Sequence, residues 1–305
     1  MNEETALLMS VLSRNYHFRE ILVTHWDPVL IETNRGMKRL RFWSDERLLR
    51  NHIDWRKQLS GGTFFVDRMY VTVSGSPFVR FGRYAITCHD APAEPALVQG
   101  YEPLWSEVVD ALLLKSQGES RQPMEQPAQE RLASMLRRME RTSALNPGEG
   151  EKLLRLCYPE AEARAARCDE LRFARSRHGK VFMLPSDFRL YPSKKLLETL
   201  FVEFGQSERV SGYPQLADFF IESMDNEGDA VVRRLFMDLI QSPHAERETA
   251  DLLQAAWYEP GEWLSLAEAS LRSQLTPEAI KVFKKNWDQK TRIISLFQSV
   301  SSGTG

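Results

Sequence analysis

The chain of 305 residues lacks features that mark several classes of protein. No stretch approaches the roughly 20 consecutive apolar residues that a membrane-spanning helix needs, so we expect no membrane segment. Its three cysteines, Cys88, Cys157 and Cys168, are widely spaced and form no C-x-x-C pair, which argues against a disulfide framework and against a zinc site. The opening residues, "MNEETALLMS", show no cationic start followed by an apolar run, as a secretory signal would. We therefore expect a cytoplasmic protein.

A strong charge of one sign is also missing. Forty basic and 42 acidic residues give a formal net charge of -2, which argues against a general nucleic-acid binder. One local exception is "RGMKRLRFW" at residues 35–43, whose basic side chains could meet phosphates. Alternation of apolar and charged positions is more typical of a half-buried strand with a solvated face, and we favour that interpretation. Nucleic acid is therefore not an expected partner.

The apolar pattern between residues 20 and 90 has the short period of strands, interrupted by one helix. Turn signals at Asp27-Pro28 and at residues 34–36 separate three strands. Residues 44–59 have helical spacing, with Ser44 as the expected N-cap, and further strands follow up to residue 90. The sequence thus predicts an N-terminal lobe over residues 1–90, with a small antiparallel five-stranded sheet and one helix.

Helical patterns dominate the rest of the chain. A Pro- and Ala-rich stretch at residues 91–102 predicts a hinge, and residues 103–300 predict a helical lobe with a frayed tail at 301–305. Helices are expected at residues 103–115, at 130–145, where Leu132 and Met139 belong to one apolar stripe, and at 193–204 ("SKKLLETLFVEF"). One short strand, Val181–Leu184, lies among them. The predicted fold class is therefore α+β with two lobes.

This layout and three motif-sized matches resemble the protein-kinase-like fold in its aminoglycoside and choline kinase branch. The resemblance is closest to the bacterial CotS-like spore-coat proteins of the YutH and YsxE kinds, and it covers about residues 18 to 297. The matching segments are "GMKRLRFW", "LASMLRRMERTS" and "GKVFMLPSDFRLYPSKKLLETL". What the resemblance implies is a two-lobed nucleotide-binding fold, with ATP and magnesium as cofactors if the pocket functions.

Four residues receive roles from this resemblance. Lys38 occupies the place of the third-strand lysine that meets nucleotide phosphates, and Glu46, or Asp45 beside it, could pair with that lysine. Asp187 matches the aspartate that closes an apolar strand and holds the metal. Counting back from Asp187 places Asp169, in "RCDELRFAR", at the proton-accepting aspartate of phosphoryl transfer.

The sequence departs from the family pattern around these residues. Arg167, Cys168 and Ala174 replace the His, the Gly and the metal-binding Asn of the catalytic loop. Arg189 and Lys195 stand where acids are usual. Magnesium requires hard oxygen ligands, so these changes remove ligands and add repelling charge. The expected function is therefore that of a catalytically impaired, kinase-like protein.

Each candidate also has a structural interpretation. Lys38 can be an exposed strand lysine, Asp169 an ordinary loop or N-cap acid, and Asp187 a carboxylate held by a structural hydrogen bond. His178 is expected in a solvated hairpin tip, and His52 as a packed helix residue.

Two functions remain open at this point. The first is a pseudokinase that acts as a binding or assembly component of the spore coat, with other coat proteins and a nucleotide as possible partners. The second is an active ATP-dependent phosphotransferase that acts on a small hydroxylated or amino-alcohol substrate.

Overall fold

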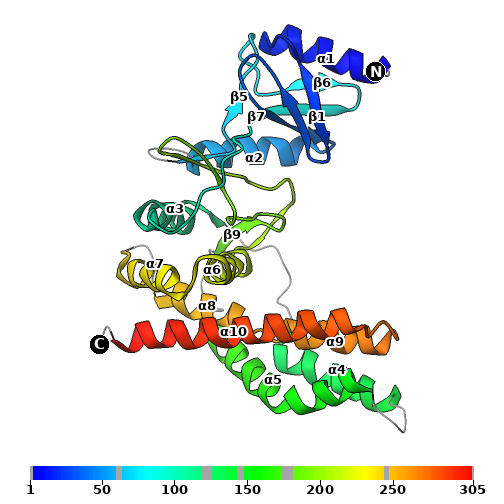
Figure 1. The fold of residues 1–305 in the computed structure, drawn as a ribbon, viewed down its shortest axis with the longest axis vertical. Coiled ribbons are helices and arrows are strands. Elements are labelled where there is room, and N and C mark those ends of the chain that lie inside the picture. Colours follow the sequence, from blue (N-terminus) through cyan, green and yellow to red (C-terminus); the bar gives the residue numbers. More distant parts are fainter. Residues whose placement is uncertain are drawn as a thin grey trace. The chain divides into compact units, whose positions relative to one another are not determined.

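A computed structural model describes residues 3–59, 64–118, 126–142, 148–173, 181–243 and 247–303. The chain divides into two compact units, which are traced in Figure 1. The first unit comprises Met1–Leu104, Leu114–Ser116 and Leu184–Val210, and the second comprises the remaining segments. The first crossing between the units follows Leu104, just beyond the predicted hinge at residues 91–102. Leu184–Val210, which the sequence analysis placed in the helical lobe, belongs to the first unit.

The first unit contains two helices and two sheets. Its elements in chain order are α1 (Glu3–Tyr16), β1 (Leu22–Trp26), β2 (Val29–Glu32), β3 (Lys38–Trp43), α2 (Glu46–Leu59), β4 (Phe64–Val66), β5 (Met69–Tyr70), β6 (Val79–Phe81), β7 (Tyr84–Asp90), β10 (Lys194–Leu196) and β11 (Thr199–Val202).

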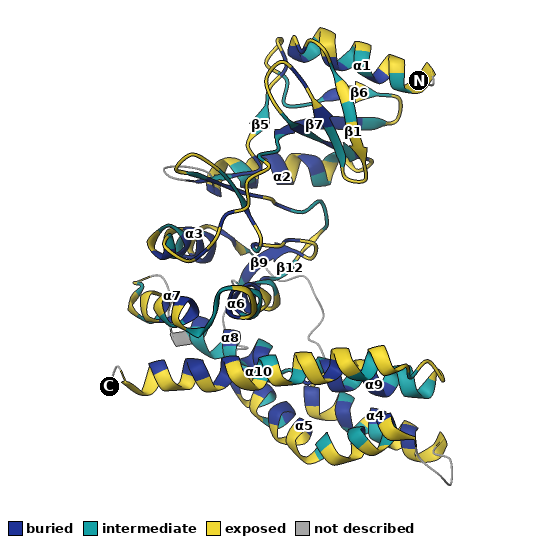
Figure 2. Ribbon diagram, viewed as in Figure 1, coloured by how far each residue is buried: buried dark blue, intermediate teal, exposed yellow. Residues whose placement is uncertain are grey.

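The larger sheet has the strand order β1-β2-β3-β7-β5, and β6 also pairs with β7. All of these pairings are antiparallel, which confirms the predicted α+β fold with an antiparallel N-terminal sheet. The sheet has six strands where five were predicted, and α1 is a second helix that the sequence analysis did not anticipate. In Figure 2 the buried faces of α1 and α2 turn toward this sheet.

The central strand β3 buries alternate residues on opposite faces of the sheet. Leu40 packs in the cluster that contains α1 residues such as Leu12, whereas Trp43 packs with Leu49 of α2. Since successive side chains of a strand point to opposite faces, the odd-numbered residues of β3 share the face of Trp43. That face carries Arg41.

The N-terminus of α2 is capped one residue later than predicted. The Asp45 carboxylate, rather than the Ser44 hydroxyl, accepts hydrogen bonds from the backbone N–H groups of Arg47 (2.8 Å) and Leu48 (3.1 Å). A carboxylate also suits the positive end of the helix dipole.

Residues 193–204 do not form the predicted helix. They form an antiparallel hairpin in which β10 pairs with β11, and β11 pairs in parallel with β4. The hairpin turn contains Leu197, which is 81% exposed and adopts a φ of 55°. The apolar run Leu200–Val202 is buried by this strand pairing, although its spacing would also suit a helix.

The second unit is mainly helical. Its elements are α3 (Glu102–Lys115, which begins in the first unit), β8 (Gln117–Gly118), α4 (Ala128–Thr142), α5 (Glu149–Phe173), α6 (Tyr213–Glu227), α7 (Asp229–Gln241), α8 (Arg247–Tyr258), α9 (Gly261–Leu271) and α10 (Pro277–Gly303). The chain passes between the units within β9 (Val181–Pro185) and β12 (Arg209–Ser211).

Aromatic side chains fill much of the core of the second unit. Phe220, Phe236, Trp257 and Phe297 come from α6, α7, α8 and α10, and their ring centroids lie 4.9–6.1 Å apart. The predicted helix at residues 103–115 and the predicted strand at Val181–Leu184 are confirmed as α3 and β9. The helix predicted at residues 130–145 is confirmed as α4 up to Thr142, and its last residues lie outside the described ranges.

Among the helices of the described ranges, none combines the length and the apolar character that crossing a bilayer requires. Ala174, His178 and part of the polar stretch between α3 and α4 lie outside the described residues.

Candidate functional site

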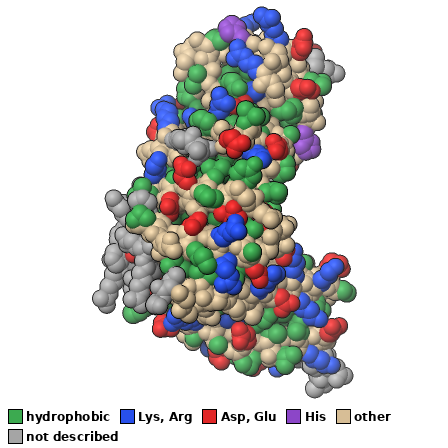
Figure 3. Space-filling view, turned by 60° about the vertical axis from the view of Figure 1, so that its left-hand side comes forward, with side chains coloured by type: hydrophobic (Ala, Val, Ile, Leu, Met, Phe, Trp, Pro, Cys, Tyr) green, Lys and Arg blue, Asp and Glu red, His purple; other side chains and the backbone are tan. Residues whose placement is uncertain are grey.

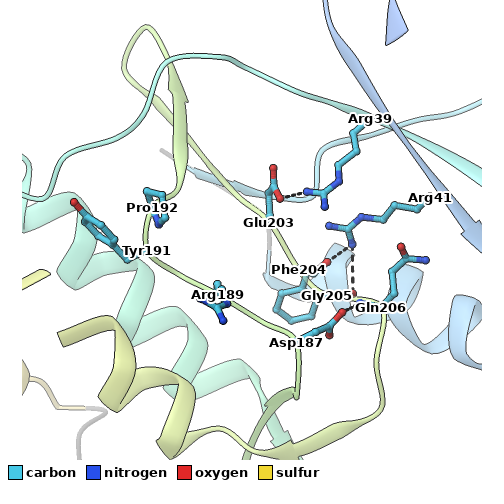
Figure 4. Close-up of a pocket in the computed structure, with 10 residues that line it drawn as sticks. All are labelled: Arg39, Arg41, Asp187, Arg189, Tyr191, Pro192, Glu203, Phe204, Gly205 and Gln206. Carbon is cyan, nitrogen blue, oxygen red and sulfur yellow. Dashed lines mark hydrogen bonds and ion pairs between the residues drawn. The ribbon is translucent and has the colours of Figure 1, made fainter. Parts of the chain in front are cut away.

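A pocket of about 300 Å³ lies within the first unit (Figure 4). Strand β3 contributes two residues, the segment after β9 contributes four, and the segment after β11 contributes four. The lining residues are Arg39, Arg41, Asp187, Arg189, Tyr191, Pro192, Glu203, Phe204, Gly205 and Gln206.

Asp187 lies two residues beyond the end of β9, and its carboxylate is held by the segment after β11. The backbone N–H of Gln206 donates to Oδ2 (2.7 Å), and the N–H of Ser207 donates to Oδ1 (3.1 Å). The Ser207 hydroxyl also donates to Oδ1. Burial opposes ionisation, yet these hydrogen bonds hold the pKa of Asp187 below its ordinary value. The carboxylate is therefore ionised and already provided with donors.

Gly205 permits this close approach of the carboxylate. A Cβ atom at position 205 would lie 1.8 Å from Oδ1 of Asp187 and 2.3 Å from its Cγ, well inside van der Waals contact. The absence of a side chain at this position is therefore what lets Asp187 reach the two backbone N–H groups.

A buried ion pair positions the wall of the pocket. Both terminal nitrogens of Arg41 bind Asp67, at 2.8 Å to Oδ2 and 2.9 Å to Oδ1, and both side chains are almost fully buried. Arg41 also donates to the carbonyl oxygen of Phe204, and Asp67 accepts from the N–H of Phe204 (2.9 Å). The two charges thus fix the peptide groups on both sides of Phe204.

Two buried histidines, His52 and His89, lie beside this ion pair. Nε2 of His52 is 3.4 Å from Oδ2 of Asp67, and Nδ1 of His89 is 3.1 Å from the carbonyl oxygen of Asp67. Burial, followed by the positive charges of Arg41 and Arg56, lowers the pKa of His52 to about 3. Burial also lowers the pKa of His89 well below its ordinary value. Both rings are therefore neutral at physiological pH.

Burial acts on Asp67 in the opposite direction. Burial raises its pKa to about 6, although Arg41 and the N–H of Phe204 favour the ionised form.

Arg39 and Glu203 form an ion pair in the lining of the pocket (Figure 4). The Arg39 side chain is 24% exposed and that of Glu203 is 46% exposed, so water reaches both partners. Burial, followed by repulsion from Arg41, lowers the pKa of Arg39, while Asp67 and Asp187 act in the opposite direction.

Lys38 does not line this pocket. Its Nζ lies 3.0 Å from Oδ1 of Asp90 and 4.9 Å from the ring centroid of Tyr70, and it also donates to the carbonyl oxygen of Arg35. The side chain is 2% exposed, and as an even-numbered residue of β3 it points to the face of Leu40. The ammonium group thus holds the β2–β3 turn against β7.

Glu46 and Asp169 have structural partners. Glu46 begins α2 and pairs with Arg50 (2.8 Å) and with Arg80. Asp169 lies in the second unit, within α5 rather than in a loop, and its carboxylate accepts from the N–H groups of Ala128 (2.7 Å) and Gln129 (3.0 Å) at the start of α4. Of the four predicted site residues, the pocket contains Asp187.

The pocket residues do not fit a magnesium ion. The Asp187 carboxylate already accepts three hydrogen bonds, Glu203 is paired with Arg39, and three guanidinium groups line the same space. Magnesium requires near-octahedral oxygen ligands and carries two positive charges of its own, so these guanidinium groups would repel it. Across the described ranges, no group of three or more His, Cys, Asp or Glu side chains is arranged to hold a metal.

The sequence analysis included Arg39 and Arg41 among the basic side chains of residues 35–43 that could meet phosphates but favoured a strand with a solvated face, and it missed Glu203. Strict alternation along β3 could have separated Arg39 and Arg41 from Lys38. For Glu203 the available signal was the triplet Glu-Phe-Gly directly after β11, which is similar to the Asp-Phe-Gly metal motif of protein kinases. The helix expected at residues 193–204 concealed that strand end.

The basic residues of the segment 35–41 do not form one surface. Arg35 is exposed, whereas Lys38 and Arg41 are buried in ion pairs on opposite faces of β3. Figure 3 shows basic and acidic side chains interspersed over the visible face.

Comparison with solved structures identifies the fold. An aminoglycoside phosphotransferase from Alicyclobacillus acidocaldarius aligns with a TM-score of 0.71 at 12% identity, covering 96% of both chains. The AMP-bound spectinomycin phosphotransferase APH(9)-Ia has a TM-score of 0.61 at 10% identity, covering 93% of this chain and 95% of that one. Its complex with ADP and spectinomycin has a TM-score of 0.60, also at 10% identity, covering 97% and 98%.

The chain therefore has the protein-kinase-like fold of the aminoglycoside phosphotransferases. No family model matches the sequence, and no curated protein matches it.

Proposed function

We propose that this chain is a catalytically impaired protein of the phosphotransferase fold, a pseudokinase that acts as a binding or assembly component. One observation carries the proposal: the carboxylates that could bind a metal are already bonded to hydrogen-bond donors of the protein itself. Asp187 is bonded to the segment after β11, and Glu203 is paired with Arg39.

The order of the pocket residues along the chain supports new roles for two of them. In protein kinases the catalytic-loop aspartate precedes the Asp-Phe-Gly aspartate that binds magnesium. Here Asp187 precedes the β10–β11 hairpin and Glu203 follows it. We infer that Asp187 stands at the catalytic-loop position and that Glu203 stands at the metal position.

These roles explain why catalysis is impaired. Phosphoryl transfer depends on metal ions that neutralise charge developing on the phosphates. An arginine already bound to the acid at the metal position competes with that ion. Removal of such stabilisation costs several kcal/mol, and about 1.4 kcal/mol corresponds to tenfold in rate.

A nucleotide is the proposed ligand of the pocket, because the structural neighbours include AMP and ADP complexes. The spore-coat setting and coat-protein partners rest on the sequence resemblance to CotS-like proteins. A tagged chain expressed in a spore-forming host is expected to fractionate with the coat. If the tagged chain is recovered from the mother-cell cytoplasm alone, the proposed association with the spore coat is refuted.

The experiment that tests impairment is transfer of the γ-phosphate of labelled ATP, with magnesium, to water, spectinomycin and choline. We expect no transfer above the protein-free rate, and no difference between the wild type and Asp187→Asn. Asp169→Asn is the matched control, since its carboxylate caps α4.

An active phosphotransferase is the second candidate, because two carboxylates, Asp187 and Glu203, line one pocket. Turnover that is abolished by Asp187→Asn and retained in Asp169→Asn would establish this alternative and refute the impaired function.

A further inference from the structure

Three exposed arginines of α4, Arg137, Arg138 and Arg141, form a basic surface on the second unit, whereas the pocket belongs to the first unit. These three residues are called the arginine stripe below. We propose that the arginine stripe is a docking surface for an acidic segment of a partner protein. The inference rests on the proposed binding function, because it names the class of partner that this function would involve.

The packing of α4 leaves this side of the helix uncovered. The helix packs against α5 and α9. Its buried residues are Ala128, Leu132, Met135 and Met139, which recur at helical spacing. The spacing of the arginine stripe places it on the side of the helix away from these residues, where the side chains are exposed. No described segment of the chain covers that side.

The arginine stripe also differs from other arginines on the helices of this unit. Arg155 of α5 and Arg272 of α9 each pair with an acid four residues earlier, at 3.0 and 2.7 Å. On α4 itself, Arg131 pairs with Glu259 of the neighbouring segment. None of the three stripe arginines has an ion pair with any residue that the structure describes. Their charges are therefore available to an external partner.

The stability of α4 does not explain the arginine stripe. The helix dipole favours cations near a C-terminus, but the effect is confined to the last turn. It accounts for Arg141, the basic residue of the last turn, and not for Arg137 or Arg138. Like charges three or four residues apart repel on a helix surface, so Arg137 and Arg138 each oppose Arg141. An anion from outside the chain would relieve this repulsion.

The acids near the arginine stripe limit the length of that anion. Glu130 lies seven residues before Arg137, which places it on the same side of the helix two turns earlier. Its charge would repel a long polyanion that followed the helix. Glu140 lies on the flank that faces α5, where burial, then Glu162, and also Glu140 raise the pKa of Tyr158.

The size and chemistry of the arginine stripe favour carboxylates over a nucleic acid. Residues 137–141 rise by about 6 Å along the helix axis, which corresponds to roughly two phosphates of one nucleic-acid strand. The formal net charge of the chain, -2, adds no general attraction for a polyanion. Arginine binds a carboxylate through two parallel hydrogen bonds, and it is enriched in protein–protein interfaces. A short acidic protein segment therefore matches the surface.

The test is the binding of a labelled, alanine-based helical peptide to the full chain, measured by fluorescence anisotropy. One peptide carries glutamates at positions i, i+3, i+4 and i+7, and a second carries glutamines at the same positions. We expect the glutamate peptide to bind and the glutamine peptide not to bind. Arg137→Gln combined with Arg141→Gln should weaken the binding about tenfold, the scale expected for two exposed ion pairs.

Arg272→Gln is the matched control, since Arg272 lies on a helix of the same unit, is 64% exposed and undergoes the same change of charge. It is expected to leave the affinity unchanged. A chain with Arg137→Glu and Arg141→Glu should lose the glutamate peptide and bind a lysine peptide of the same spacing. Because both positions are exposed, circular dichroism should show an unchanged helix content in these variants.

Three results would overturn the proposal. The first is no binding of the glutamate peptide, and the second is equal weakening by Arg272→Gln. The third is tighter binding of single-stranded RNA or of phosphatidylserine vesicles than of the peptide, lost in the same double variant, which would assign the arginine stripe to a different class of partner. Phosphoryl transfer in the earlier assay would refute the impaired function and leave the docking surface to be judged by peptide binding. Absence of both transfer and peptide binding would refute this inference alone.

Discussion

His52 makes the stability of the first unit depend on pH. Its pKa falls from 6.5 in the unfolded chain to about 3 in the fold, because the ring is buried beside Arg41 and Arg56. On acidification the unfolded chain therefore takes up a proton first, and this favours unfolding. The stability that neutral His52 provides is complete above pH 6.5 and is lost as the pH falls toward 3.

The magnitude follows from the two pKa values. At pH 5 the pH lies 1.5 units below the pKa of 6.5 that His52 has in the unfolded chain. Protonation of His52 in the unfolded state therefore lowers the free energy of unfolding by about 2 kcal/mol. His89 adds a loss of the same sign. Asp67 has the opposite effect on stability. Its pKa is about 6 in the fold and 3.8 in the unfolded chain, so between pH 6 and pH 3.8 the folded state takes up the proton first and is stabilised. Two histidines against one aspartate leave a net loss.

Urea unfolding followed by tryptophan fluorescence at pH 7.5 and pH 5 measures this loss in wild type and in His52→Leu, which keeps a buried side chain of similar volume. The variant should lose about 2 kcal/mol less than wild type over this interval. His25→Leu is the control, since His25 is exposed on β1 and meets water in both states. Equal losses in wild type and His52→Leu would refute the reasoning. They would mean that His52 is protonated in the fold and paired with Oδ2 of Asp67.

Further predictions concern single contacts. Gly205→Ala should shift Asp187 off its N–H donors and lower the melting temperature, measured by circular dichroism; an unchanged melting temperature would contradict the 1.8 Å approach. Asp67→Ala should cost about 3–5 kcal/mol in urea unfolding, because it leaves Arg41 buried and unpaired, and a cost below about 1 kcal/mol would contradict this. Asp169→Ala should cost about 1 kcal/mol through the lost cap of α4, and a neutral effect in the same assay would exclude that role. Trp257→Ala should cost about 3–5 kcal/mol, because the ring is fully buried; a value near zero would mean that the aromatic core repacks.

Helices with a continuous apolar stripe could be predicted from the sequence. In α4 the residues Leu132, Met135 and Met139 recur at helical spacing, and all three are buried. The same local signal was ambiguous at residues 193–204, where Leu196, Leu200 and Phe201 also suit a helix. The pairing of β11 with β4 determines the structure of this segment. The two strands are far apart in the sequence, so the local spacing of apolar residues cannot predict their pairing.

The turn of that hairpin was also hidden. Two-residue hairpin turns usually contain Gly or Asn, which tolerate positive φ, and can therefore be predicted from the sequence. Here Leu197 adopts a φ of 55° without either residue. When the hairpin is interpreted as a helix, the end of β11 before Glu203-Phe204-Gly205 is not recognised, and Glu203 does not enter the set of candidate residues.

The candidate lysine shows how a shift of one residue changes a site. Lys38 and Arg39 are neighbours in sequence, yet they point to opposite faces of β3 because side chains alternate along a strand. One is buried against Asp90, and the other reaches the pocket and Glu203. A motif match that counts basic residues without assigning faces cannot distinguish them.

Arg39 explains why the pocket does not suit a metal ion. In the proposed function Glu203 stands at the metal position, and the Arg39 guanidinium group bound to it supplies the positive charge that a magnesium ion would bring to that carboxylate. Unlike the ion, it is tethered to β3 and cannot follow a phosphate along a reaction path. Arg41 and Asp67 hold the opposite side of Phe204 in place, so the pocket keeps its shape without a metal.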